Sequence, residues 1–223
     1  MFSTKSPKIK THKTLRLMEI KPKNSLDLGL RKAVRDGDLQ SAKQFISAGA
    51  DPMEADSLSL RTAARKGDAQ MLEFLVERSQ PSARKFEALK AAVIGGSEEC
   101  LAILLPYANP VDVAQCGAIS QAISLDRQRM LEMLIFMADP ECLMNSRFIL
   151  RAICEKRHEC SKILCRAMYD AGGRAPFLAA ERLFMREGRE EHISILRSML
   201  DIIVLNKDTP QPASTSQQRS LRI

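Results

Sequence analysis

The chain has 223 residues, of which 45% are hydrophobic and 27% charged, so it can bury a sizeable core and is not disordered as a whole. Aromatic residues make up only 4%, Trp is absent, and Gly and Pro number ten each, a profile that excludes a β-sandwich or β-barrel and is typical of an all-α protein. The formal net charge of +7 lies near the two ends of the chain, so it does not indicate a nucleic-acid-binding surface on the body between them.

Residues 1–25 are predicted to form a basic, disordered N-terminal extension. They contain seven Lys or Arg and a single acidic residue, Glu19, which gives a net charge of +6. Two alternatives remain for this segment: weak attraction to anionic membrane or nucleic acid, and a targeting or export signal. Specific nucleic-acid binding is not expected. No stretch of the chain reaches the roughly 18 apolar residues of a membrane span, so no transmembrane segment is expected.

Residues 26–205 are predicted to form one repeat domain, because a single pattern recurs in them about every 30 residues. The pattern Leu-x-x-Ala-Val-x-x-Gly-Asp at 30–38 recurs in closely related form at 60–68 and 89–97, with fainter copies at 119–126 and 149–156. Its small residue is Ala33, Ala63, Ala92, Ala122 and Ala152, at spacings of 30, 29, 30 and 30 residues. A sixth copy before Gly188 is weak, so the domain has five or six units.

Each unit is predicted to be a helix, a tight turn at the Gly, and a second, antiparallel helix. Apolar residues three apart follow each turn, as in Leu72 and Leu75, and this spacing suits a helix face. The small Ala lets neighbouring first helices approach closely. Phe184 replaces it in the sixth unit, where a terminal helix has no next neighbour to accommodate. Caps are expected at Ser25, Asp56, Ser82, Asn109, Asn145 and Ala175.

These residues resemble the ankyrin repeat, which has a Leu, a small Ala pair, a Gly at the inter-helix turn, and a Leu-rich second helix ending in Gly-Ala-Asp. The fullest match is 30–52, closing on Ala-Gly-Ala-Asp-Pro. The resemblance implies an all-α, ankyrin-like helical-hairpin solenoid of five to six repeats with disordered tails. The Thr-Pro-Leu-His start of the family is not intact, and the period is near 30 instead of about 33. The β-turn finger between units, as at 79–82, is therefore expected to be shortened.

The resemblance also implies a binding surface, because in this family the residues between the Ala pair and the Gly point into the concave face. Here that surface is cationic in the first two units and apolar in the middle, a combination that suits a protein interface. The alternative is that these are ordinary solvated helix faces. The predicted partner-binding residues are Arg31, Arg35, Asp36, Arg61, Arg65, Lys66, Ile94 and Leu125.

A metal site and catalysis are the competing chemical hypotheses. Cys154, His158, Cys160 and Cys165 suggest zinc, but Cys160 and Cys165 fall at repeat-core positions, so packing as small hydrophobes is expected there. Cys154 and His158, one turn apart, are the remaining candidate nucleophile and base, and no catalytic motif accompanies them. No metal, cofactor or enzymatic activity is expected. Six scattered Cys in a body of this size favour a reducing compartment.

Residues 206–223 are predicted to be a disordered tail rich in Pro, Ser, Thr and Gln, with a C-terminal Leu-Arg-Ile that could match a PDZ groove. The predicted function is non-enzymatic binding of another protein through the concave face, as a scaffold, inhibitor or delivered effector. The expected location is the cytoplasm of the producing cell, or of a host cell after export. The alternative is a tether, in which the basic N-terminal arm binds anionic membrane or nucleic acid and the solenoid is a spacer.

Overall fold

The computed structural model describes residues 23–208, which fold into fourteen α-helices and one 3₁₀ turn, η1 (Leu105–Tyr107), with no strand in this range. The prediction of an all-α fold is confirmed. None of the helices in the described range is both long and apolar enough to cross a membrane. The helices are α1 (Lys23–Asp36), α2 (Leu39–Ser47), α3 (Glu54–Lys66), α4 (Ala69–Val76), α5 (Ala83–Gly95), α6 (Glu98–Leu104), α7 (Pro110–Gln115), α8 (Ala118–Ser124), α9 (Gln128–Met137), α10 (Pro140–Leu143), α11 (Arg147–Cys154), α12 (His158–Gly172), α13 (Ala175–Arg186) and α14 (Glu190–Asp208).

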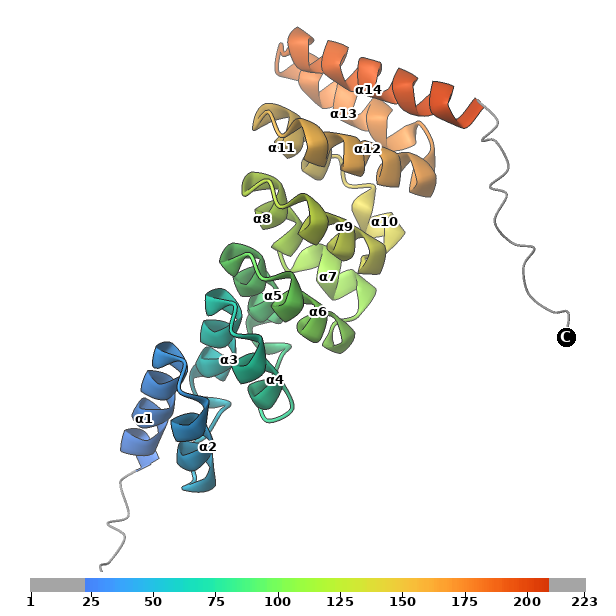
Figure 1. Cartoon of the computed structure of the whole chain (residues 1–223). Coiled ribbons are helices and arrows are strands. Elements are labelled where there is room, and N and C mark those ends of the chain that lie inside the picture. The colour runs from blue at the N-terminus through green and yellow to red at the C-terminus, as the bar shows by residue number, and fades with distance from the viewer. Residues whose placement is uncertain (1–22, 209–223) are drawn as a thin grey trace, which may run out of the picture.

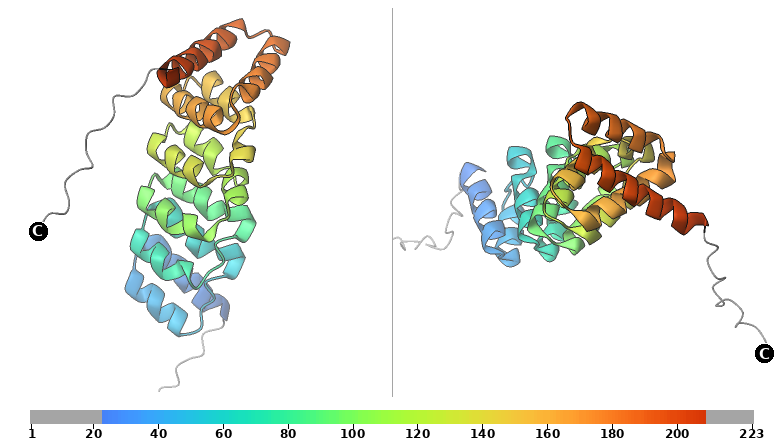
Figure 2. Two further views of the ribbon diagram at one scale, coloured as in Figure 1. Left: turned by 90° about the vertical axis from the view of Figure 1, so that its right-hand side faces the viewer. Right: turned by 90° about the horizontal axis from the view of Figure 1, so that it is seen from above.

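Twelve of these helices form six helix–turn–helix pairs, which we call units one to six. The first helices of the units are α1, α3, α5, α8, α11 and α13, and the second helices are α2, α4, α6, α9, α12 and α14. The units follow one another along a single axis, with first helices packed on first helices and, from α4 onward, second helices on second helices (Figures 1 and 2). The fold is therefore a two-layered stack of helix pairs.

The helical region is slightly longer than the predicted repeat domain. Helix α1 begins at Lys23 and α14 ends at Asp208, whereas the predicted repeat domain runs from 26 to 205. The expected caps at the two ends are also displaced: Ser25 lies inside α1, and α13 begins at Ala175 after Arg174. The remaining predictions about the tails concern residues 1–22 and 209–223, which lie outside the described residues.

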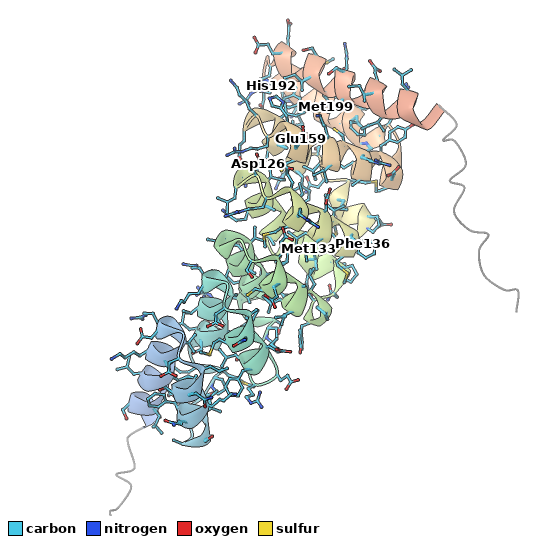
Figure 3. All side chains as sticks on the ribbon, in the orientation of Figure 1. Asp126, Met133, Phe136, Glu159, His192 and Met199 are labelled. Carbon is cyan, nitrogen blue, oxygen red and sulfur yellow. The ribbon has the colours of Figure 1, made fainter. Side chains whose placement is uncertain are left out.

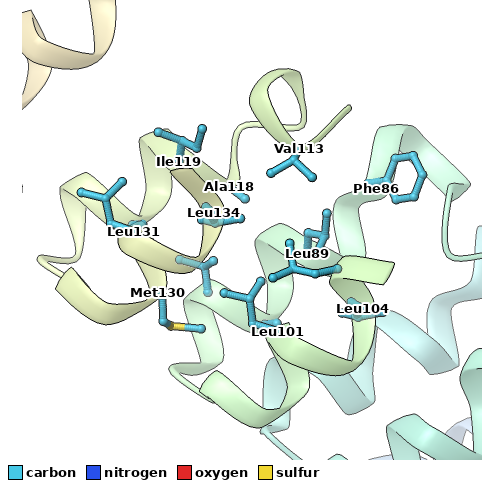
Figure 4. Packing of buried hydrophobic residues seen from close by; sticks show 14 of the residues in the cluster. Phe86, Leu89, Leu101, Leu104, Val113, Ala118, Ile119, Met130, Leu131 and Leu134 are labelled. Carbon is cyan, nitrogen blue, oxygen red and sulfur yellow. The ribbon is translucent and has the colours of Figure 1, made fainter. Parts of the chain in front are cut away.

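A continuous apolar core runs between the two layers and from one unit to the next. Figure 4 shows Leu89 and Leu101 of unit three on the side that faces Met130 and Leu134 of unit four. The small Ala of the repeat pattern lies in this core, since its five copies have exposed fractions of 5% or less (Ala33, Ala63, Ala92, Ala122 and Ala152). The small side chain at this buried position lets successive first helices pack closely, as the sequence predicts.

The turn inside each unit explains why the repeat pattern ends in Gly. After each first helix, one residue adopts a left-handed conformation with φ between +55° and +81°. In units one, two, four and five the residue that follows donates its backbone N–H to the carbonyl of the small Ala, as Asp38 does to Ala33 at 2.9 Å. This is the Schellman ending, which Gly favours because it has no Cβ. The left-handed residues are Gly37, Gly67, Gly96, Asp126, Lys156 and Gly188.

Units four and five therefore place a side chain where the backbone prefers Gly. Lys156 has a φ of +56° and is exposed, and the left-handed region costs a residue with a Cβ roughly 1 kcal/mol. We expect Lys156→Gly to raise the free energy of unfolding by about 1 kcal/mol. Lys162→Gly, in the interior of α12, should lower it by about the same amount. Urea denaturation of the two variants distinguishes relief of the left-handed strain at position 156 from the general destabilising effect of Gly. A loss of stability in both variants would contradict the strain that we assign to Lys156.

The first four connections between units each contain a proline, and in the described range none of them contains a β-strand. Pro52, Pro81, Pro110 and Pro140 are spaced 29, 29 and 30 residues apart, each after a buried small residue and one polar residue. In units four and five this proline starts a separate short helix, α7 or α10. In these two connections a short helix therefore stands where the sequence predicts a shortened β-turn finger.

In units two and three, the same connection contains a left-handed turn. Ala55, Asp56 and Ser57 have φ values of 52–57°, and residues 84–86 repeat this with values of 51–57°. The expected cap at Asp56 was wrong, because this residue lies inside that turn. Ser57 is buried and accepts the backbone N–H of Gln80 at 2.9 Å, which ties the connection to the next one. That bond offsets part of the backbone strain.

Unit six is the last helix pair of the described stack, and Phe184 stands at the position of its small Ala. The side chain of Phe184 is fully buried, although no further unit of the described residues packs on this end. Its ring stacks on that of His192 in α14, with 5.2 Å between the ring centroids. Helix α14 lies across α11 and α12 at the end of the stack (Figure 1), so a large side chain fills the space that a small residue and a next unit occupy elsewhere.

Candidate functional site

The predicted partner-binding residues at the ends of the first helices form a row along the stack. They lie at the carboxyl ends of α1, α3 and α5 and directly after α8, and these four helices pack side by side in that order. All six side chains are exposed, and the two apolar ones retain 36% (Ile94) and 41% (Leu125) of their surface. We call this surface the first-helix row: Arg35, Asp36, Arg65, Lys66, Ile94 and Leu125. Its role in partner binding stays a prediction.

Two other predicted binding residues, Arg31 and Arg61, instead link neighbouring units. The Arg31 guanidinium lies 2.7 Å from the Glu54 carboxylate, and that of Arg61 lies 2.8 Å from Glu87. Arg61 also donates to the backbone carbonyl of Ala55 at 3.1 Å, and its side chain is only 13% exposed. A partner would have to displace these partly buried ion pairs to reach either arginine, so we leave both out of the first-helix row.

Lys66 combines exposure with a structural contact. Its Nζ donates a hydrogen bond to the backbone carbonyl of Arg35, at the carboxyl end of α1 in the preceding unit. In the same way Arg157 Nη2 donates to the carbonyl of Ser124 at 2.8 Å, at the end of α8. A cation at the carboxyl end of a helix is favourable, because the last carbonyls lack intrahelical partners and carry partial negative charge. Lys66 therefore helps to hold units one and two together.

A groove of about 970 Å³ lies between units four and five, on the same face of the first helices. Its walls come from the region of α7 and α8 on one side and of α10 and α11 on the other. Ser120 lines it, and Ser120 stands one turn before Ser124 at the position that Arg31 and Arg61 hold in units one and two. Those arginines form ion pairs with Glu54 and Glu87 of the next unit, whereas the short Ser120 side chain lines the groove.

Sequence reasoning missed this groove. The prolines that start α7 and α10 are visible in the sequence, each after a capping residue: Asn109 accepts the backbone N–H of Asp112 at 2.8 Å, and Asp139 accepts that of Cys142 at 3.2 Å. Asn109 was predicted as a cap, and it is one, but of α7 and not of the first helix of its unit. The signal that could have revealed the groove was two helix starts within one connection.

The most exposed aromatic side chain of the described region lies away from this face. Phe136, near the end of the second helix α9, is 86% exposed. In Figure 3 it projects on the right of the stack, while Asp126 in the α8–α9 turn and His192 at the start of α14 lie on the left. A single exposed ring does not make an apolar patch, so Phe136 is separate from the candidate site.

The Cys and His residues do not form a metal site in the described region. No three His, Cys, Asp or Glu side chains between residues 23 and 208 come close enough to hold an ion together. Cys160 and Cys165 are fully buried, which confirms their predicted packing in the core. Cys154 is exposed, and Arg189 Nη1 lies 3.0 Å from its Sγ across the interface between units five and six.

The two buried thiols predict a loss of stability in alkali. Burial raises the pKa of Cys165 to about 12, and burial together with the Asp126 carboxylate raises that of Cys160 to about 12. Because the folded pKa lies above the unfolded value of about 8.5, this stability is fully present below that pH and is lost as pH rises toward 12. We expect a lower urea midpoint at pH 10 than at pH 7, and a smaller difference in the Cys160→Ala/Cys165→Ala variant. An unchanged difference would contradict this assignment.

Comparison with protein-family models and with curated proteins found no match to this chain. What the structure defines is an all-helical stack of helix pairs, with an exposed row along its first helices and a groove between two of its units. The first-helix row and the groove lie on the same face, so they form one candidate binding surface.

Proposed function

We propose that this protein is a non-enzymatic binding module, which holds another protein against the first helices of an ankyrin-like stack. The observation that carries the proposal is the contrast along the first helices. In units one to four the small inward Ala is always buried, while the two exposed positions that follow it change from Arg35/Asp36 and Arg65/Lys66 to an apolar residue, Ile94 in unit three and Leu125 in unit four. A constant interior with a varied exterior is what a binding surface on a repeated scaffold requires.

The mechanism is occupancy by a pre-organised surface. The first-helix row is fixed by helices that pack on one another and by links such as Arg31–Glu54 and Lys66 to the Arg35 carbonyl, so little order has to be gained on binding. Arg35 and Arg65 favour an acidic region of the partner at one end, and Ile94 and Leu125 favour an apolar region beside it. In this proposal the protein works in a reducing cytoplasm as a scaffold, an inhibitor or a delivered effector.

The test is capture of partners from a reduced lysate by the tagged full chain, read by mass spectrometry at two salt concentrations. Reversing the charge of the row in the Arg35→Glu/Arg65→Glu variant should weaken capture of the partner by about tenfold or more. Arg166→Glu, on the exposed face of the second helix α12, is the matched control and should change capture little.

A chain lacking residues 1–22 separates this proposal from a tether. Our proposal expects the shortened chain to retain its partner at both salt concentrations, because the row carries the contacts. If the row variant captures the same proteins as the unmodified chain, and the shortened chain loses them or releases them at moderate salt, the basic N-terminal segment carries the function. That result would overturn the proposal.

A further inference from the structure

The groove between units four and five has the chemistry of a peptide-binding site. Its apolar lining comes from Met144, Phe148 and Leu150, which are half-buried and keep part of their surface accessible. Gln115 and Asn145 are exposed at the same groove and carry amide groups that can bind the backbone of an extended chain. Pockets that hold drug-sized ligands reach about 1,000 Å³, so this groove has room for a short run of residues.

The charges at the groove favour an acidic ligand. Arg147 and Arg151 stand one turn apart on α11, and Glu141 is the acidic residue that lines the groove with them. Arg147 makes no ion pair within residues 23–208, and Arg151 has an exposed partner, Glu155, at 3.7 Å, a contact that contributes little in water. Two guanidinium groups on neighbouring turns can contact one carboxylate together, or two carboxylates separately.

We propose that this groove binds an extended segment of a partner protein in which an acidic side chain lies close to a bulky apolar one. The apolar side chain packs against Phe148 and Leu150, and the carboxylate pairs with Arg147 and Arg151. This inference rests on the proposed function and gives the partner a defined chemistry, because the groove continues the surface on which the first-helix row lies. The short side chain of Ser120 leaves room in the groove, since the longer side chain of an Arg at its position would extend into it.

The probe is an array of short synthetic peptides, each with one Leu or Phe and one Glu placed one to four residues away, measured against the full chain by fluorescence anisotropy. Peptides with Gln or Lys in place of Glu are the comparison. We expect at least one spacing at which the Glu peptide binds about tenfold more tightly than its Gln counterpart. Equal binding of Glu, Gln and Lys peptides at every spacing would overturn the proposal.

Three variants locate the binding. Ser120→Arg should abolish it by filling the groove, and Arg147→Glu should weaken Glu peptides by about tenfold or more and favour the Lys series. Arg166→Glu, on the second helix α12, is the matched surface control. All three are judged only if their helical circular dichroism matches that of the unmodified chain. Retained peptide binding by Ser120→Arg would overturn the assignment to this groove.

The same variants separate failure of the groove from failure of the proposed function. A partner that is captured by Ser120→Arg and lost by Arg35→Glu/Arg65→Glu leaves the binding function intact and overturns the groove proposal. Specific peptide binding by a chain that captures no partner through its first-helix row supports the groove and overturns the wider proposal.

Discussion

Replacing Phe184 by Ala should lower the free energy of unfolding by about 3–5 kcal/mol, which is the range for deleting a fully buried Phe. The side chain has no exposed surface and stacks on His192, so its removal leaves a cavity between α13, α14 and the preceding unit. The stability of a stack is set by each unit and its nearest neighbours. The loss should therefore fall mainly on unit six.

Hydrogen exchange tests this local prediction. In Phe184→Ala, backbone amides of α13 and α14 should lose protection first, while those of α3 to α9 should keep theirs, because α13 and α14 pack on α11 and α12. Met185→Ala is the matched control, because Met185 is the next residue of α13 and is 56% exposed. It should change the free energy of unfolding by less than about 0.5 kcal/mol. Equal loss of protection in every unit would contradict the view that unit six is a separate end cap.

The repeat itself was predictable from the sequence because its chemistry is local. A left-handed residue after the first helix favours Gly, the next residue must accept a backbone N–H at the start of the second helix, and Asp38 and Asp68 do so with their carboxylates. The Ser41 hydroxyl and backbone N–H lower the pKa of Asp38, as expected for a carboxylate that caps a helix. These requirements involve residues within one turn of each other, so they produce a short sequence pattern that can be recognised in each unit.

The connections between units were less predictable. The left-handed turn at 55–57 contains no Gly, so its backbone conformation has no signature in the residue types. The short helices α7 and α10 do have one, a cap followed by proline, but Asn109 was assigned to the next first helix and no cap was predicted at Asp139. Recognising α7 and α10 as separate helices is important, because they form two of the walls of the groove.

The candidate site was predicted in part. The exposed positions of Arg35, Arg65, Ile94 and Leu125 follow from their place in the repeat. Arg31 and Arg61 occupy an equally regular position, but their partners Glu54 and Glu87 lie 23 and 26 residues further along the chain. Those two partners do not occupy equivalent places in their units, so no repeat pattern reveals the pairing. Which arginine is available to a partner depends on inter-unit packing, and that required the structure.

Close packing of the first helices predicts an unusual response to Gly95→Ala. In most helices Ala stabilises relative to Gly by about 1 kcal/mol, because Gly loses more backbone entropy. Here a Cβ on Gly95 would lie 2.3 Å from the carbonyl O of Arg65 and 3.0 Å from that of Ala64. Both are backbone atoms of α3, so the contact is relieved only if α3 and α5 move apart. We expect the free energy of unfolding to fall by roughly 1–3 kcal/mol, the usual cost of overpacking.

Gly172→Ala is the matched control, because Gly172 is likewise the last residue of its helix, α12. Its Cβ would lie 2.4 Å from Met144 Sδ, the end of a flexible side chain that can turn away, so the loss should be clearly smaller. Urea denaturation measures the free energy of unfolding of both variants. The two values can be compared if the slope of that free energy against urea concentration is unchanged. If Gly95→Ala is as stable as the unmodified chain, or if both variants lose equally, the contact between α3 and α5 does not limit that position. If the predicted difference is found, the spacing of the first helices, and with it the geometry of the first-helix row, is set by backbone contact between units two and three.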